Sequence, residues 1–397
     1  MHFDAIGRVP GDPILGLMEA YALDPNPRKF DLGVGVYKDA QGLTSIPQAV
    51  KLAEARLVDR QATKTYIGGH GEPAFGKVIN ELVLGADSAL IAEQRAGVTQ
   101  TPGGTGALRL SADFIAQCLP GRGVWLSSPT WPIHETIFAA AGVKVSHYPY
   151  VGSDNHLDVD AMLAALEAAP KGDVVLLHAC CHNPTGFDLS HDDWRRLLKV
   201  VRSRDLLPLI DFAYQGFGDG LEQDAWSTRL FAAELPEVLI TSSCSKNFGL
   251  YRDRTGALIV CAKTADKLVD IRSQLANIAR NLWSTPPDHG AAVVATILGD
   301  PQLKSLWADE VETMRLRIAQ LRSGLVEALE PHGLRERFAH IGVQRGMFSY
   351  TGLTPEQVKK LRDQHSVYMV GTGRANVAGI DASRLDLLAE AIADVCR

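Results

Sequence analysis

VLITSSCSKNFGLYRDRTG, residues 238–256, is the stretch that decides the fold class. It opens with a β-branched apolar run, which predicts a short buried strand. Small polar residues follow around a single lysine, Lys246, and a second apolar run begins after Arg254. A lysine held among small residues where a strand ends is withdrawn from water, so its amine loses a proton more easily and can act as a nucleophile or base. The alternative is an ordinary solvated loop lysine, and the stretch by itself favours that alternative.

Apolar runs alternate with helical patterns on both sides of this stretch, from about residue 98 to residue 262. DVVLLHACCHNPTG (173–186) and LLPLIDFAYQGFGDG (206–220) are each predicted to be a buried strand that ends in polar residues. The glycine-rich turn Gly103–Gly106 leads directly into an amphipathic helix. This alternation indicates an α/β fold with a largely parallel sheet. A strand and turn are expected at 30–42, and further helices at 14–23, 47–60 and 288–330 and from about Pro73 and Pro355.

The composition is that of an ordinary globular protein, with 46% hydrophobic and 22% charged residues in 397. The net charge of −6 and the lack of a basic block argue against nucleic acid or an anionic membrane as a partner. No apolar run is long enough to cross a bilayer, and no secretory signal is expected at the N-terminus. Six cysteines in so long a chain do not form a disulfide framework, so reduced thiols in a cytoplasmic protein are expected.

Sequence motifs for nucleotides and metals are incomplete. Gly33-Val-Gly35 does not continue into the dinucleotide fingerprint, and the phosphate-binding P-loop pattern is absent. His182 follows Cys180 and Cys181, but this spacing does not match a zinc site. The sequence therefore predicts no metal and disfavours a nicotinamide or nucleotide enzyme.

Polar residues of several kinds do gather where the predicted strands end, and ligands of open α/β sheets bind at these carboxyl ends. Pyridoxal phosphate carries an aldehyde, a ring nitrogen, a ring hydroxyl and a phosphate, and it would use a lysine, an acid, polar side chains and an anion site. A helix start supplies free N–H groups for a phosphate, although a plain turn would explain the glycines equally well. The residues concerned are Asn183, Asp211, Tyr214, Lys246, Arg254 and the turn Gly103–Gly106.

The chain resembles the class I pyridoxal-phosphate aminotransferases of the aspartate and aromatic amino-acid group. The matching segments are SSCSKNFGLYRDRTG, CCHNPTG, DFAYQGFGDG, QTPGGTGALR, SPTWPIHE and YMVGTGRANVAG, and they lie in the family's order and spacing. The resemblance implies a fold-type I architecture. A large cofactor-binding domain of about 45–312 would hold a mostly parallel seven-stranded sheet, and 1–44 with 313–397 would form an N-terminal arm and a smaller α+β domain. It also implies a homodimer with shared active sites.

The same resemblance gives the cofactor residues their roles. Lys246 would hold pyridoxal phosphate covalently and move a proton during the reaction, Asp211 would keep the ring nitrogen protonated, and Tyr214 would complete the catalytic set. His134 and His178 would lie behind Asp211, although each could equally be an ordinary core histidine. The other implied cofactor contacts are Gly104, Thr105, Ser243 and Arg254 at the phosphate, Tyr66 reaching it from the neighbouring subunit, Trp131 on the ring, and Asn183 with Tyr214 at the ring oxygen.

Two arginines are expected to select the substrate. By resemblance, Arg374 clamps the α-carboxylate, because a guanidinium fork suits a planar carboxylate better than an ammonium does. Arg280 matches the family's arginine that crosses the dimer interface to bind a side-chain carboxylate. The remaining implied substrate contacts are Gly35, Trp131, Asn183 and Phe348.

Two substrate classes compete. Arg280 suits aspartate, glutamate and 2-oxoglutarate, but Asn281-Leu282-Trp283 and Thr285 depart from the usual aspartate-enzyme pattern. We therefore expect an aromatic amino-acid aminotransferase that converts phenylalanine or tyrosine with 2-oxoglutarate and retains aspartate activity, and a dedicated aspartate aminotransferase is the alternative. A non-catalytic regulator on this fold would carry an added DNA-binding domain, and a lyase or decarboxylase would not need Arg280 and Arg374 together.

Overall fold

The computed structural model describes residues 2–8, 11, 13–152 and 155–397 of the chain. These residues form two compact units. Unit 1 comprises Met1–Leu43, Ile318–Val343 and Met347–Arg397, and unit 2 comprises Thr44–Arg317 with Gln344–Gly346. The expected assignment of 45–312 to a cofactor-binding domain stays a prediction.

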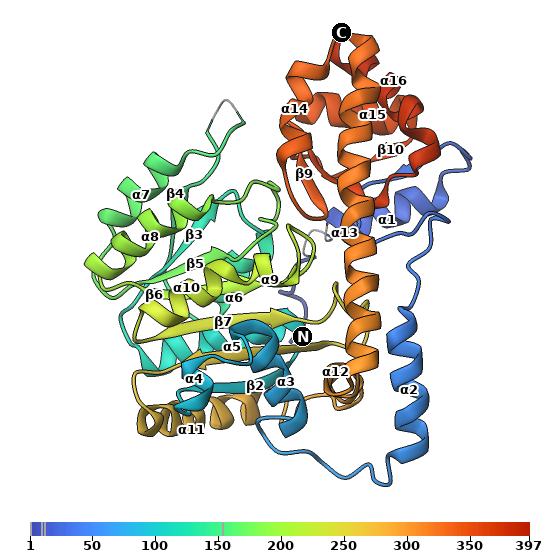
Figure 1. Cartoon of the computed structure of the whole chain (residues 1–397). Coiled ribbons are helices and arrows are strands. Elements are labelled where there is room, and N and C mark those ends of the chain that lie inside the picture. Colours follow the sequence, from blue (N-terminus) through green and yellow to red (C-terminus); the bar gives the residue numbers. More distant parts are fainter. Residues whose placement is uncertain (1, 9–10, 12, 153–154) are drawn as a thin grey trace. The chain divides into compact units, whose positions relative to one another are not determined.

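Unit 2 is built on a seven-stranded sheet with the order β2-β8-β7-β6-β5-β3-β4 (Figure 1). Within the described residues, β8 is the one strand of this sheet that runs antiparallel to its neighbours. The predicted α/β fold with a mostly parallel sheet is therefore confirmed. The strands are β2 (Ala96–Pro102), β3 (Val124–Ser128), β4 (Val145–Pro149), β5 (Val174–His178), β6 (Leu207–Phe212), β7 (Val238–Ser243) and β8 (Thr255–Cys261).

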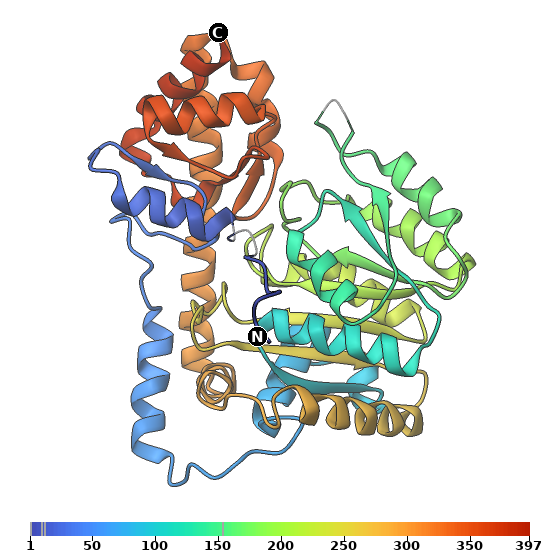
Figure 2. The same cartoon turned by 180° about the vertical axis from the view of Figure 1, so that it is seen from behind.

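Helices cover both faces of this sheet, which explains why its central strands are continuous apolar runs. The helices α5 (Gly103–Cys118) and α11 (Ala265–Leu282) cover one face of the sheet, which is turned toward the viewer in Figure 2. Their side chains form a large hydrophobic cluster with those of the strands. On the other face lie α3 (Pro73–Leu84), α8 (His191–Ser203) and α10 (Trp226–Glu234). The other helices of unit 2 are α2 (Gln48–Arg60), α4 (Ala89–Ala92), α6 (Pro132–Ala140), α7 (Val159–Glu167), α9 (Leu221–Asp224) and α12 (His289–Gly299).

Unit 1 has its own hydrophobic core, in which the C-terminal part of α13 (Pro301–Leu329) packs with the last helices of the chain. Two small sheets complete it: β1 (Phe30–Asp31) pairs in parallel with β10 (Val367–Tyr368), and β9 (Phe348–Tyr350) pairs antiparallel with β11 (Arg374–Asn376). The remaining elements are α1 (Pro13–Leu23), α14 (Arg335–Val343), α15 (Pro355–His365), α16 (Leu385–Cys396) and three short 3₁₀ turns, η1 (Glu330–His332), η2 (Val377–Gly379) and η3 (Ala382–Arg384).

The strand expected within 30–42 is much shorter than predicted, because side chains rather than a neighbouring strand bind the backbone there. Only β1 is extended and paired. Beyond it, the Asn376 amide donates hydrogen bonds to two carbonyl oxygens of the 34–36 segment. The Asp31 carboxylate also binds the Lys38 ammonium at 2.9 Å. The result is an ordered loop that closes on β11.

The helical region expected at 288–330 is divided into α12 and α13. Asp300 separates the two helices, and its carboxylate accepts hydrogen bonds from the backbone N–H groups of Gln302 and Leu303. Pro301 then occupies the first position of α13, where its missing N–H and fixed φ are tolerated. Capping of this kind ends one helix and starts the next without a long loop.

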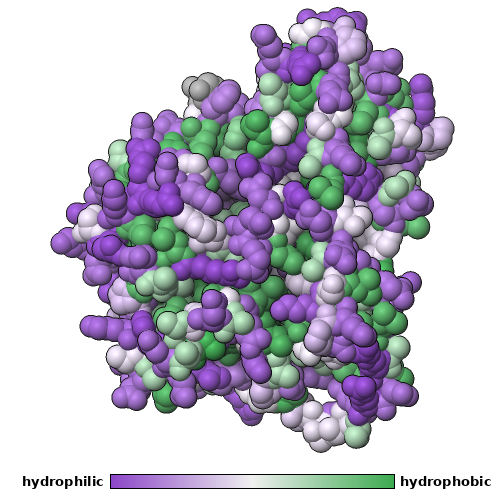
Figure 3. Space-filling view, viewed as in Figure 1, coloured by the Kyte–Doolittle hydropathy of each residue, from purple (hydrophilic) through white to green (hydrophobic). Residues whose placement is uncertain are grey.

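Hydrophilic residues cover most of the face shown in Figure 3, with hydrophobic residues scattered among them. Large apolar side chains are nevertheless exposed near the N-terminus, among them Phe3 (79%), Leu15 (63%) and Leu23 (77%). Within the described part of the chain, no helix combines the length and the apolar character that a membrane span requires.

Candidate active site

Lys246 lies in the turn after β7, where the chain leaves the sheet. Its Nζ lies over the ring of Tyr214, 5.3 Å from the ring centre. The pKa of Lys246 is lowered to about 8, chiefly by burial and to a smaller extent by the positive charge of Arg254, against the opposing effect of Asp211. At pH 7 about one amine in ten is neutral at such a pKa, against far fewer for an ordinary lysine. The geometry therefore supports a nucleophile or base at this position.

Asp211 is a buried carboxylate near the end of β6 that keeps its charge. The Thr241 hydroxyl donates to its Oδ1 at 2.9 Å, and His134 Nε2 lies 3.2 Å from its Oδ2. Burial by itself would raise the pKa of Asp211, but the interactions with His134, His178 and Thr241 together lower it below its usual value. A carboxylate of this kind can hold a proton on a basic nitrogen that binds against it.

A chain of hydrogen bonds continues behind Asp211. Thr130 Oγ1 lies 2.9 Å from His134 Nδ1 and 3.2 Å from His178 Nε2, and the Asn183 backbone N–H donates to His178 Nδ1 at 3.5 Å. One placement of hydrogens satisfies every link, with each group donating to the next in the order Asn183, His178, Thr130, His134, Asp211. We call these five residues the histidine relay. Burial and the neighbouring His134 lower the pKa of His178 to about 3, so this ring is neutral and fits the relay.

The start of α5 forms a cradle for an anion. Gly103 has φ +73°, and a Cβ added there would lie 2.5 Å from Arg254 Nη2. A Cβ added at Gly104 would lie 3.1 Å from Ser243 Cβ. The glycines thus let the helix start approach a guanidinium and a hydroxyl closely, and Thr105 follows them in the first turn. Free N–H groups, a hydroxyl and a positive charge converge on one place, which suits a phosphate.

These groups fit pyridoxal phosphate. Asn183 Oδ1 is buried and has no hydrogen-bond partner among the described residues, which leaves its amide able to bind an added polar group. Trp131 caps the start of α6, and its ring lies edge-on to His134 with centres 5.2 Å apart. Four groups of the site match four groups of this cofactor. Lys246 matches the aldehyde, Asp211 the ring nitrogen, the Asn183 amide oxygen the ring hydroxyl, and the anion cradle the phosphate.

The predicted substrate residues of unit 1 lie together. The Arg374 side chain is buried, and its Nη2 donates to the Gly33 carbonyl oxygen at 2.8 Å. Its guanidinium carbon lies over the Phe348 ring, 4.4 Å from the ring centre. A Cβ added at Gly35 would lie 2.9 Å from the tip of the same ring. Phe348 therefore contacts both other predicted residues and holds the guanidinium in place.

Tyr66 and Arg280, the two residues expected to act across a subunit interface, are both exposed. Tyr66 is 93% exposed, and Arg280 is exposed in the last turn of α11. Among the described residues, neither side chain has a hydrogen bond or ion pair.

Comparison with known proteins identifies the family. The family model for aminotransferase class I and II matches residues 27–392. The chain belongs to this family. It is a transaminase that depends on pyridoxal phosphate.

Relatives of this transaminase match along its whole length. An aromatic-amino-acid aminotransferase of Pseudomonas aeruginosa is 75% identical over 395 residues, covering 100% of this chain and 99% of the relative. The aspartate aminotransferase of Escherichia coli is 46% identical, covering 99% of this chain and 100% of the relative. The crystal structure of the aromatic-amino-acid aminotransferase of Burkholderia pseudomallei, covalently bound to pyridoxal phosphate, has a TM-score of 0.98 at 44% identity and covers 100% of both chains.

The structure adds residues of the transaminase site that sequence reasoning missed. Thr130 and Thr241 belong to segments singled out in the sequence, but nothing in the sequence pairs them with Asp211. His182 stands out in the sequence only as a possible metal ligand. Its Nε2 lies 2.9 Å from Ser127 Oγ, and its ring stacks on Tyr150 with centres 3.9 Å apart. It therefore fixes the loop that carries the neighbouring Asn183.

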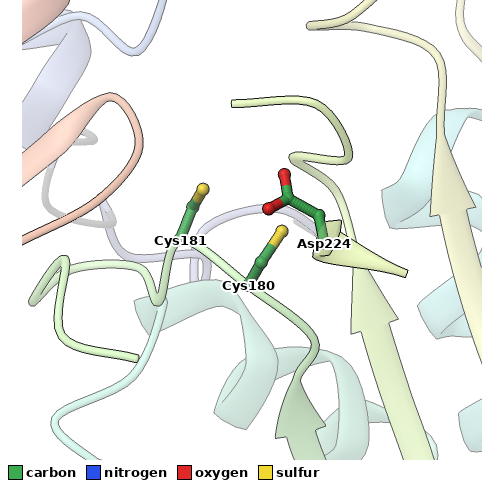
Figure 4. Close-up of side chains that lie close together, drawn as sticks. All are labelled: Cys180, Cys181 and Asp224. Atoms are coloured by element: carbon green, nitrogen blue, oxygen red, sulfur yellow. The ribbon is translucent and has the colours of Figure 1, made fainter. Parts of the chain in front are cut away.

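Two cysteines and an aspartate form a cluster in the transaminase that resembles a metal site (Figure 4). Potential ligand atoms of Cys180, Cys181 and Asp224 all lie within 4.8 Å of one another. The Asp224 carboxylate, however, accepts three hydrogen bonds from backbone N–H groups of the 216–219 loop, at 2.7–2.9 Å. Burial raises the pKa of Cys180 far above its usual value, and a protonated thiol is a poor metal ligand. We assign the cluster a structural role, in which the carboxylate anchors the loop after Tyr214.

Replacing Asp224 tests this structural role. We expect Asp224→Asn to lower the free energy of unfolding by about 2–4 kcal/mol, because hydrogen bonds to a buried charge are lost. Urea titration with and without EDTA measures it. Asp219→Asn is the matched control in the same loop, because its carboxylate makes only an exposed ion pair with Arg345. A loss of wild-type stability on adding EDTA would point to a metal instead.

The lowered pKa of Lys246 predicts how cofactor loading depends on pH. If Lys246 is the residue that holds pyridoxal phosphate, only its neutral amine would bond to the aldehyde, so the rate at which cofactor-free enzyme binds the cofactor covalently should rise with pH and level off above about 8. Stopped-flow absorbance measures this rate. Lys246→Arg is the control, because it keeps the charge but forms no covalent link. A rate that still rises steeply at pH 10 would contradict the assigned pKa.

Proposed function

We propose that this transaminase moves the amino group between aromatic amino acids and 2-oxoglutarate and that it also accepts aspartate. The observation that carries the proposal is the relative from P. aeruginosa, which is 75% identical along the whole chain and is named an aromatic-amino-acid aminotransferase. The aspartate aminotransferases are markedly less similar, at 46% identity or below.

Two ionisable side chains would carry the proton chemistry. Bound pyridoxal phosphate supplies an electron sink for negative charge at the substrate α-carbon. Lys246 would hold the cofactor, and its amine, free once the substrate amine has displaced it, would take the proton from the α-carbon and return it on the other side of the reaction. Asp211 holds the proton on the ring nitrogen, and the histidine relay keeps that carboxylate charged and correctly oriented.

Neutral groups and the anion cradle would orient the cofactor. Asn183 and Tyr214 would donate to the ring oxygen, and Trp131 would lie on the ring. The helix start with Gly104 and Thr105, together with Ser243 and Arg254, would hold the phosphate. These roles follow the family resemblance, and the close packing at the glycines supports the phosphate site.

Different residues would recognise the α-carboxylate, which all substrates share, and the side chain, which varies between them. Arg374 would bind the α-carboxylate that every substrate carries, and Gly35 and Phe348 beside it would line the pocket for the side chain. An aromatic ring next to the arginine suits phenylalanine and tyrosine, because rings pack favourably edge to face. Arg280 would bind the second carboxylate of aspartate or 2-oxoglutarate.

We further propose that the active form is a homodimer in the cytoplasm. Tyr66 and Arg280 are exposed in the single chain, as expected of residues that serve the site of a second subunit. All six cysteines are free, which fits a reducing compartment.

A dedicated aspartate aminotransferase is the second candidate. Arg280 favours it, because a guanidinium in an apolar pocket would oppose an aromatic ring unless it moves or is shielded. Relatives named aspartate aminotransferase also match the whole chain.

Half-reactions distinguish the two candidates. The purified holoenzyme is mixed with phenylalanine or with aspartate alone, and conversion of the cofactor to its amine form is followed by stopped-flow absorbance. We expect both amino acids to convert it at rates within about tenfold of each other, since Arg374 binds either α-carboxylate. Conversion by aspartate alone would favour the second candidate.

Arg280→Ala should separate the two kinds of substrate. Losing the charge-assisted pair should lower kcat/KM for aspartate by about 100-fold or more, and that for phenylalanine by less than about threefold. Steady-state assays with each amino acid measure the two effects. Equal losses would contradict the assigned role.

The same variant also tests the shared site. Arg280→Ala should be strongly impaired with aspartate and Lys246→Ala inactive. Mixing the two after mild unfolding should restore part of the activity, because a hybrid dimer has one site with both residues intact. Arg280→Lys serves as the control that keeps the charge but lacks the fork. A fully active monomer on a sizing column would contradict the dimer.

A further inference from the structure

Arg322 is a buried arginine in unit 1 to which the sequence assigns no role. It lies on α13, and only 2% of its surface is exposed. Arginine is rarely buried to this extent, because removing a guanidinium from water costs several kcal/mol unless its donors are satisfied. The burial of Arg322 must therefore be explained by the groups to which it donates hydrogen bonds.

Three hydrogen bonds of Arg322 lead to the two segments next to α13. Its Nη1 donates to the Ile341 carbonyl oxygen at 3.1 Å and to Ser349 Oγ at 2.5 Å, and its Nη2 donates to the Phe348 carbonyl oxygen at 2.5 Å. Ile341 lies in α14, and the other two residues lie in β9. One rigid fork therefore fixes β9 against α13 and α14.

The strand β9 carries the aromatic ring of the proposed substrate pocket. Phe348 pairs with Asn376 of β11, and Tyr350 pairs with Arg374. The Phe348 ring is held between the guanidinium of Arg374 and the backbone of Gly35. The Phe348 side chain is attached to the backbone of β9, so a small shift of this strand would move the ring away from Arg374.

We propose that Arg322 is a positioning residue for substrate binding. Its guanidinium fixes β9 so that the Phe348 ring lies on Arg374, which presents the arginine to the α-carboxylate and the ring to the substrate side chain. This inference rests on the proposed roles of Phe348 and Arg374. The competing explanation is that Arg322 only fills and stabilises the core of unit 1.

Three variants separate these explanations. Arg322→Met keeps the length and apolar stem but removes the donors, and Arg322→Lys keeps the charge without the fork. Leu325→Ala is the matched control on the same helix, because Leu325 is 4% exposed in the unit 1 core and lies outside the hydrogen bonds to β9. Each is studied as holoenzyme by phenylalanine half-reactions, thermal unfolding and the cofactor absorbance spectrum.

We expect Arg322→Met to raise the phenylalanine concentration for half-maximal rate about tenfold, with the maximal rate and the spectrum nearly unchanged. Arg322→Lys should recover part of this loss. Leu325→Ala should lower the unfolding temperature comparably and leave the half-maximal concentration within about twofold, since it leaves a cavity but keeps β9 in place. Equal changes in Arg322→Met and Leu325→Ala would overturn the proposal.

A double-mutant cycle with Phe348→Leu tests the route of the effect. If Arg322 acts through the ring, Arg322→Met should add little in the Phe348→Leu background. Full additivity would overturn the proposal. If the wild type does not convert phenylalanine at all, the proposed aromatic function is refuted, but the proposal for Arg322 is not. The same series of variants is then measured with aspartate, because Arg374 would bind the α-carboxylate of either substrate.

Discussion

The negative charge of Asp211, kept inside the protein, is the constraint on which the rest of unit 2 depends. A buried carboxylate would normally take up a proton, and a protonated acid could not fill the role proposed for Asp211, which is to hold a proton on the cofactor ring. Thr241 and His134 prevent this by donating to both oxygens. Because one donor lies on β7 and the other on α6, the sheet and α6 must keep their positions for the charge to survive. The hydrogen bonds from Thr241 and His134 to Asp211 therefore serve both the fold and the proposed proton chemistry.

Residues that lie where single strands end could be predicted from the sequence. Lys246, Asp211 and Asn183 each follow an apolar run, and the structure gives them the burial, partners and open amide that the proposed chemistry needs. Their neighbours could not be predicted in this way, because contacts across a sheet depend on strand order. Thr241 stands opposite Asp211 in the register of β6 and β7, which only the assembled sheet reveals. His178, which stands opposite Asp211 in the register of β5 and β6, is expected there from the family resemblance and not from the strand pattern.

Other features could not be predicted from the sequence, for different physical reasons. The loop after β1 resembles a strand in sequence because its apolar residues alternate, but side chains of distant segments bind its backbone. Arg322 has no sequence signal, since a lysine or arginine on a long helix normally faces water. The substrate residues Gly35, Phe348 and Arg374 are predicted by family resemblance alone, and no periodicity would have joined them.

The histidine relay also bears on how the enzyme would respond to acidification of its surroundings. Histidines near a catalytic carboxylate would ordinarily switch charge in the range through which a stressed cell's interior passes. Here burial keeps His178 neutral to about pH 3. Acidification would thus leave the His178 ring neutral and its contact with Thr130 in place. In a mildly acidified cell the inner end of the relay would therefore keep its order of hydrogen bonds, whereas the amine of Lys246, with a pKa of about 8, carries a proton under the same conditions.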